Sequence, residues 1–229
     1  MLKMDSTSLI CCLLFLSVDL SIGIEVACSN DTNVNAVCEC TEITVDCANR
    51  GLNEWPVGIP LDIIILYMNN NNLKEIDEDA LSKLHKLGTI NVNNNLLSKL
   101  PSLPKTIGNI HADKNLLTDI STVFNDLPFL RILSLTNNKI TILRNTTFQG
   151  STVITNLDLS SNDINIIEPF TFANNSELSA LRILYNKKLQ MLGENAFAFT
   201  NGRSVDILIS PSVVELSTGT FKLSTGSSM

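Results

Sequence analysis

Aliphatic residues recur along the chain in a frame of about 24 residues, and each copy of the frame carries one asparagine. The apolar positions follow the spacing Leu-x-x-Leu-x-Leu-x-x-Asn-x-Leu-x-x-Leu. Because successive side chains of a strand point to opposite faces, the Leu-x-Leu core of each frame predicts a short strand with one buried face. The asparagines of the six clear copies are separated by 24, 20, 23, 24 and 24 residues: Asn71, Asn95, Asn115, Asn138, Asn162 and Asn186.

A second periodic set, of phenylalanines, keeps the same phase as the asparagines. Its members lie 24, 24, 25 and 24 residues apart: Phe124, Phe148, Phe172, Phe197 and Phe221. Leu81 takes the matching place in the first copy. We expect these side chains to pack inside each coil on the convex side. The last of them implies a seventh, degenerate repeat around residues 204–221.

Repeats of this kind are expected to stack as a solenoid. One coil cannot bury its own apolar positions, so neighbouring coils must cover them. Each asparagine lies where the chain turns away from the strand, and its amide can satisfy backbone groups that would otherwise be buried unpaired. We therefore interpret the asparagines as scaffold. A fixed period of 20–29 residues with this pattern is typical of leucine-rich repeats.

The expected fold class is accordingly α/β, a leucine-rich repeat solenoid or horseshoe. Its concave side is a parallel sheet, and its convex side consists of irregular, 3₁₀ or short helical segments. The expected divisions are a signal peptide over residues 1–23, a disulfide-rich N-terminal cap over 28–60, repeats over 61–221 and a polar tail over 222–229. The apolar run of the first segment is too short for a comfortable membrane span, so we expect cleavage and secretion, with an uncleaved anchor as the alternative.

Four cysteines remain after the expected signal peptide, and all of them precede the repeats. An even number in a secreted chain favours disulfides, and four cysteines allow three connectivities. The Cys-x-Cys spacing is closer than the pairs usual at zinc sites, so we expect no metal and no cofactor. The four residues are Cys28, Cys38, Cys40 and Cys47.

Residues 38–60, C-E-C-T-E-I-T-V-D-C-A-N-R-G-L-N-E-W-P-V-G-I-P, resemble the N-terminal cysteine-rich cap of extracellular leucine-rich repeat proteins. The resemblance implies that Cys28 pairs with Cys40 and Cys38 with Cys47. The short repeat near residues 97–120, with two prolines, looks like the short repeats of small leucine-rich proteoglycans, the decorin-like matrix proteins. Two features depart from that subfamily: nine residues separate Cys28 from Cys38, and no C-terminal cysteine pair follows.

In such a fold the strand residues between the buried leucines face the concave side, and we expect a ligand there. The surface is mostly uncharged and rich in hydrogen-bonding groups; a solvated polar face without a ligand is the alternative. His111 and Asp113, beside Asn91 and Ser134, form the patch most suggestive of function. The candidate binding residues are Tyr67, Asn91, Asn109, His111, Asp113, Ser134, Asn156, Asp158 and Arg182.

The composition and motifs exclude several classes of function. A net charge of −7 disfavours binding to nucleic acid, which requires clustered basic residues. There is no Gly-x-Ser-x-Gly, His-Glu-x-x-His or phosphate-cradling glycine loop, so we expect no catalytic residue and no enzyme activity. The leading hypothesis is an extracellular protein-binding module, secreted or of the receptor-ectodomain type, that recognises a protein, microbial or cell-surface ligand. The rival is a structural matrix component that binds collagen.

Three sequons fit an extracellular protein and predict glycosylation at Asn30, Asn145 and Asn174. No capping cysteines follow the last repeat. Three explanations of that end remain open: truncation, which we favour, a partner or second copy that covers it, and a polar tail that suffices as a cap.

Overall fold

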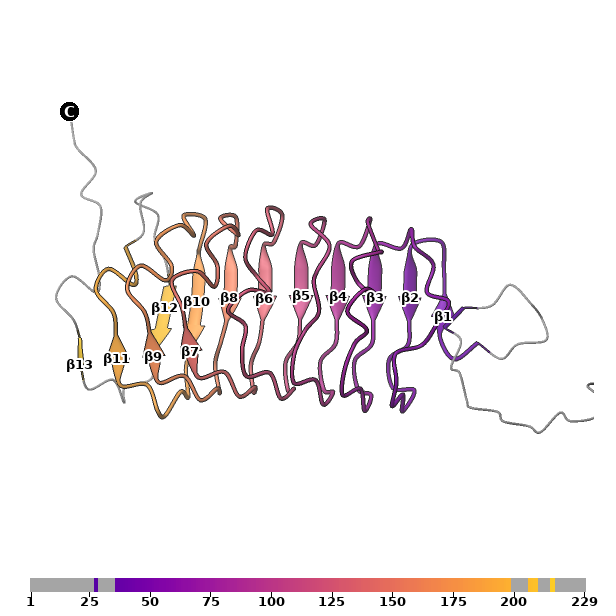
Figure 1. Ribbon diagram of the computed structural model, residues 1–229, viewed down its shortest axis with the longest axis horizontal. Coiled ribbons are helices and arrows are strands. Elements are labelled where there is room, and N and C mark those ends of the chain that lie inside the picture. The colour runs from indigo at the N-terminus through magenta and orange to yellow at the C-terminus, as the bar shows by residue number, and fades with distance from the viewer. Residues whose placement is uncertain (1–26, 29–35, 199–205, 210–214, 217–229) are drawn as a thin grey trace, which may run out of the picture.

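The protein forms a solenoid of short strands, seen in a computed structural model that describes residues 27–28, 36–198, 206–209 and 215–216. Nine strands lie side by side in one sheet (Figure 1). In spatial order they are β1 (Glu39–Cys40), β2 (Thr44–Asp46), β3 (Ile65–Tyr67), β4 (Thr89–Asn91), β5 (Asn109–His111), β6 (Ile132–Ser134), β8 (Asn156–Asp158), β10 (Ala180–Ile183) and β12 (Asp206–Ile209). From β2 onward every pair is parallel.

The sequence frame sets the register of this sheet. The central aliphatic residue of each repeat lies beside its counterpart in the next coil: Leu66, Ile90, Ile110, Leu133, Leu157, Leu181 and Ile207. The first six of these are buried. The parallel-sheet solenoid predicted from the period is therefore confirmed, with about seven turns. β12 belongs to the expected seventh repeat, whereas Phe221 lies outside the described residues.

The side away from this sheet is built from turns and very short strands. Four two-residue strands form a second parallel sheet: β7 (Ile142–Leu143), β9 (Ile166–Ile167), β11 (Met191–Leu192) and β13 (Glu215–Leu216). Of the forms expected for the convex side, the irregular one is found, and no helix occurs within the described residues. Isolated turns, such as the one closed by Leu84 N donating to Leu81 O at 3.0 Å, contain too few residues to propagate a helix.

The phenylalanines stack along the inside of this turn side. Phe124, Phe148, Phe172 and Phe197 are all buried, and successive ring centroids lie 6.3, 5.9 and 5.5 Å apart. The expected packing of these four residues is confirmed. Each ring fills the centre of its own coil and contacts its equivalents in the neighbouring coils.

The six frame asparagines are buried and bind backbone atoms of two coils. Asn138 Nδ2 donates to Leu135 O in its own coil at 3.1 Å and to Ala112 O in the preceding coil at 2.9 Å. Its Oδ1 accepts Leu117 N at 3.1 Å. The other five repeat this arrangement. The scaffold role predicted for the asparagines is thereby confirmed.

The N-terminal end of the solenoid is covered by a disulfide-bonded hairpin. β1 pairs antiparallel with β2, and the structure contains the disulfides Cys28–Cys40 and Cys38–Cys47, the pairing that the resemblance implies. Val45 in β2 is fully buried and lies beside Leu66 of the first repeat. The cap thus shields the apolar end of the first coil.

No helix among the described residues is long and apolar enough to cross a membrane. The expected signal peptide and polar tail both lie outside the described residues.

Candidate functional site

The exposed side of the nine-stranded sheet, which we call the strand face, collects all nine candidate residues on one surface. In each short strand the central side chain is buried and its two neighbours are partly or fully exposed. The second exposed position supplies Tyr67, Asn91, His111, Ser134, Asp158 and Arg182. Asn109 and Asn156 come from the first exposed position, and Asp113 lies just beyond β5.

Asp113 has a structural task within this face. Its Oδ1 accepts the Ser134 hydroxyl at 2.6 Å and the backbone N–H of Thr136 at 2.7 Å, both from the next coil. The backbone N–H of Asp113 in turn donates to Asn93 Oδ1 at 2.6 Å. These bonds tie three consecutive coils together where the strands end. A substitution of Asp113 would therefore disturb the scaffold as well as any ligand.

Three further candidates are also engaged by the protein. Asn91 Oδ1 accepts the N–H of Asn93, and Asp158 Oδ1 accepts the N–H of Ser160, each at 3.0 Å. These are side-chain-to-backbone turns that end the strands. Asn109 Nδ2 donates to Thr89 Oγ1 at 3.1 Å.

Four candidates keep their polar or aromatic groups available. Within the described residues the side chains of Tyr67, His111, Asn156 and Arg182 make no hydrogen bond or ion pair. Tyr67 lies near the cap and Arg182 near the last coils. Free groups are therefore present on the strand face from β3 to β10.

The patch around His111 does not form a nucleophile and its base. A nucleophilic hydroxyl requires a general base within hydrogen-bonding reach. Ser134 instead donates its hydroxyl to Asp113, and His111 contacts neither through a hydrogen bond. Among the described residues no group of three His, Cys, Asp or Glu side chains could hold a metal ion.

Two consecutive coils have a glycine at one edge of the strand face, and we call the place where their side chains are missing the glycine gap. Gly88 and Gly108 immediately precede β4 and β5, where other coils have residues such as Ile64 and Thr155. A Cβ at either glycine would meet its nearest atoms at 3.5–3.6 Å, an ordinary contact, so there is room for a Cβ at both positions. The gap lies between Ile64, which is 41% exposed, and the coil that contains the exposed Ile132.

Tyr185 is a candidate that sequence reasoning missed. It precedes the buried Asn186, a position whose φ is positive in all six repeats: Asn70, Asn94, Lys114, Asn137, Ser161 and Tyr185. Tyr185 has a φ of 60° and is 67% exposed. A tyrosine is poorly suited to this conformation. The place of Tyr185 in the frame, beside a scaffold asparagine, is the signal that would have identified it.

Comparisons with known proteins agree with this architecture. Residues 109–164 match the family model described as leucine rich repeat. Human oligodendrocyte-myelin glycoprotein is 29% identical over 188 residues, a match that covers 70% of this chain and 41% of that protein. Mouse podocan is 31% identical over 173 residues, covering 75% of this chain and 25% of that protein.

A solved structure supports the fold alone. A chain from the crystal structure of a TLR13–ssRNA13 complex has a TM-score of 0.51 and 23% sequence identity, covering 58% of this chain and 21% of that chain. The present chain spans less than half the length of the two relatives above.

Proposed function

We propose that this chain, an extracellular leucine-rich repeat protein with an N-terminal cysteine-rich cap, binds a protein ligand on its strand face. The observation that carries the proposal is the set of four free side chains on a surface where the other five candidate residues are hydrogen-bonded within the protein. Tyr67, His111, Asn156 and Arg182 remain available to a partner. Extended surfaces of this kind are what solenoids use for recognition.

The chemistry of the free residues fits a protein partner. Tyrosine and arginine are enriched among the residues that dominate protein–protein interfaces. Tyr67 and Arg182 lie on β3 and β10, with four strands of the sheet between them. A ligand that touches both must be extended, which favours a folded protein or a long segment over a small molecule.

The glycine gap is a candidate centre for this contact. Where the backbone is not strained, replacing glycine by alanine stabilises a protein by about 0.4–1 kcal/mol, and neither Gly88 nor Gly108 is needed to relieve a clash. Two consecutive coils therefore lack a side chain that the fold would accept. We infer that the gap receives an apolar side chain of the ligand, which would pack against Ile64.

The test is a binding screen followed by matched arginine substitutions. The secreted chain is screened against purified extracellular proteins, with fibrillar collagens included to test the matrix alternative. Gly108→Arg fills the gap and should weaken binding of the captured protein at least tenfold. Thr152→Arg adds the same side chain to an exposed turn away from the strand face and should leave affinity within twofold.

Two results would refute the placement. One is equal loss of affinity from the two arginine variants. The other is unchanged affinity in Gly108→Arg, Tyr67→Ala and Arg182→Ala together. Circular dichroism melting of each variant separates loss of contact from loss of fold. If the captured protein is a collagen and Gly108→Arg weakens its binding, the matrix role is favoured over the receptor-type role.

Glycans are proposed on the opposite side of the solenoid. Asn145 and Asn174 are exposed and lie in turns outside the nine-stranded sheet, whereas Asn30 lies outside the described residues. Glycans at the first two positions would leave the strand face open. A mobility shift on enzymatic deglycosylation, lost in Asn145→Gln and Asn174→Gln, checks their occupancy.

A further inference from the structure

A shortened repeat opens a pocket on the turn side of the solenoid. Asn95 and Asn115 are only 20 residues apart, and the segment between them has buried Pro101 and Pro104 but no phenylalanine. Turns of the coils before and after this segment therefore both line one pocket of about 240 Å³. We call it the short-repeat pocket. None of its residues belongs to the strand face.

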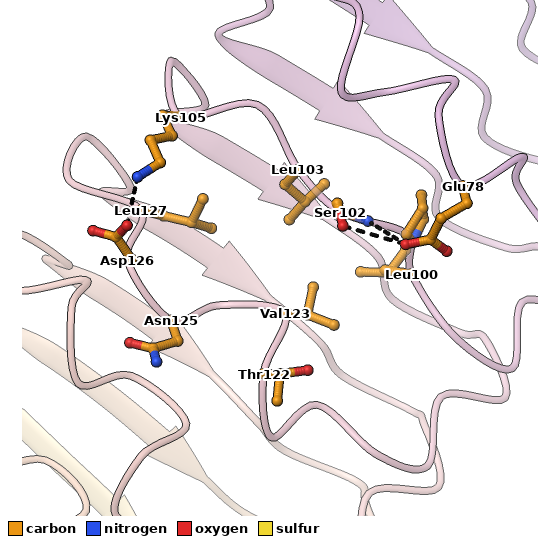
Figure 2. A pocket seen from close by; sticks show the side chains of 11 residues that line it. Glu78, Leu100, Ser102, Leu103, Lys105, Thr122, Val123, Asn125, Asp126 and Leu127 are labelled. Carbon is orange, nitrogen blue, oxygen red and sulfur yellow. Dashed lines mark hydrogen bonds and ion pairs between the residues drawn. The ribbon is translucent and has the colours of Figure 1, made fainter.

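The pocket has an apolar middle and two polar ends (Figure 2). Leu103 and Val123, both half-buried, lie between the ends. At one end Lys105 Nζ pairs with Asp126 Oδ2 at 2.5 Å. At the other end Glu78 Oε1 accepts the N–H and the hydroxyl of Ser102 at 3.3 and 3.2 Å.

The charge of the pocket is not balanced. Lys105 and Asp126 neutralise one another, whereas Glu78 forms no ion pair within the described part of the chain. Ser102 donates to only one of the two carboxylate oxygens of Glu78, Oε1, and leaves Oε2 without a partner from Ser102. Glu78 also lines a neighbouring open hollow in which four carboxylates face two lysines: Glu54, Glu75, Asp77 and Glu78 against Lys74 and Lys99. A cation is therefore attracted to the Glu78 end.

The size of the pocket limits what can enter. Pockets for drug-sized molecules occupy roughly 300–1,000 Å³, so this one is small and suits a single long side chain. Lysine and arginine combine an aliphatic stem with a charged head and bury the stem along apolar surface. Both parts have a counterpart here, because the stem matches the apolar middle and the head matches the carboxylate.

We propose that the short-repeat pocket binds a lysine or arginine side chain of a partner protein. The stem lies on Leu103 and Val123, and the cationic head pairs with Glu78 Oε2. This site lies apart from the strand face, so its test is independent of the ligand proposed there.

The test uses a defined probe and an isosteric control. N-acetyl-arginine methylamide is titrated into the ¹⁵N-labelled chain and followed by NMR, and the citrulline analogue supplies the same shape without charge. We expect the arginine probe to shift the amide signals of Ser102, Leu103 and Val123. The citrulline analogue should bind at least fivefold more weakly.

Substitutions identify the carboxylate responsible. Glu78→Gln keeps an acceptor for Ser102 and should reduce affinity for the arginine probe at least fivefold. Glu75→Gln makes the same charge change on an exposed neighbour that does not line this pocket, and it should change affinity less than twofold. Thr122→Trp, which narrows the pocket without altering its charge, should also weaken binding.

Three outcomes would overturn the proposal. The arginine probe could shift signals elsewhere or none at all. Citrulline could bind as well as arginine. The two glutamine variants could weaken binding equally, which would mean that the general negative field, not Glu78, attracts the probe.

Discussion

The turn side of the solenoid differs before and after the short repeat. From Phe124 to Phe197 each coil contributes one buried phenylalanine, and the rings stack nearly parallel, with interplanar angles of 16–18°. Before Phe124 the matching positions hold Leu81 and a proline-containing segment, and a pocket replaces the stack. A constant repeat length keeps equivalent phenylalanines of neighbouring coils in contact. A repeat that is a few residues shorter ends this stack and leaves the short-repeat pocket in its place.

The greatest loss of stability is expected when a phenylalanine in the middle of the stack is removed. Phe148→Ala removes a buried ring that contacts two others and should lower the free energy of unfolding by about 3–5 kcal/mol. Phe124→Ala should cost about 1 kcal/mol less, because only one ring contact is lost. Urea denaturation of the two variants measures the difference. Equal losses would mean that the stack adds nothing beyond the burial of each ring.

A smaller change in stability is expected from glycine substitutions where the turns of neighbouring coils pack backbone against backbone. A Cβ at Gly150 would lie 2.6 Å from the backbone of Asp126, so Gly150→Ala should destabilise the protein by about 1–3 kcal/mol through overpacking. Gly108→Ala, where there is room for a Cβ, should instead stabilise it by about 0.5 kcal/mol. Shifts of thermal midpoint in opposite directions would support the contrast, and a loss in both variants would contradict it.

The smallest change in stability is expected at the residue before each scaffold asparagine, which has a positive φ and lies in the left-handed conformation. Before the short repeat this residue is Asn70 or Asn94, whereas the sixth repeat has Tyr185. Asparagine adopts the conformation more readily, so Tyr185→Asn should stabilise the protein by about 1 kcal/mol. If Tyr185 also contacts the ligand, the same variant should bind it more weakly. Unfolding and affinity measurements on one preparation give both values. A fall in stability would indicate that the exposed ring makes favourable contacts of its own.

Much of the architecture follows from the sequence because it repeats. The spacing of Leu66, Met68 and Asn71 returns in all six clear repeats, so the strand, its buried side and the turn after it could be assigned together. The regular spacing of the phenylalanines likewise predicted that their rings pack inside each coil. The disulfide pairing came from the resemblance of the cap, since spacing alone left three connectivities open.

The candidate site could be predicted only in outline. Alternation along each strand placed nine residues on one face, but it did not distinguish free groups from engaged ones. Asp113 looked like a ligand-binding carboxylate, and the structure shows it holding Ser134 and Thr136 of the next coil. The short-repeat pocket and the exposed Tyr185 also depend on neighbouring coils.

The repeated pattern therefore defines the coil: which residues face inward, where the strand lies and where the chain turns. These properties are local, and the same residue spacing encodes them in each of the six clear repeats. Which surface groups remain free, and where the surface is hollow, became known only from the stacking of the coils. Those properties depend on pairs such as Lys105 and Asp126 or Glu78 and Ser102, which lie more than 20 residues apart and meet only when successive coils stack.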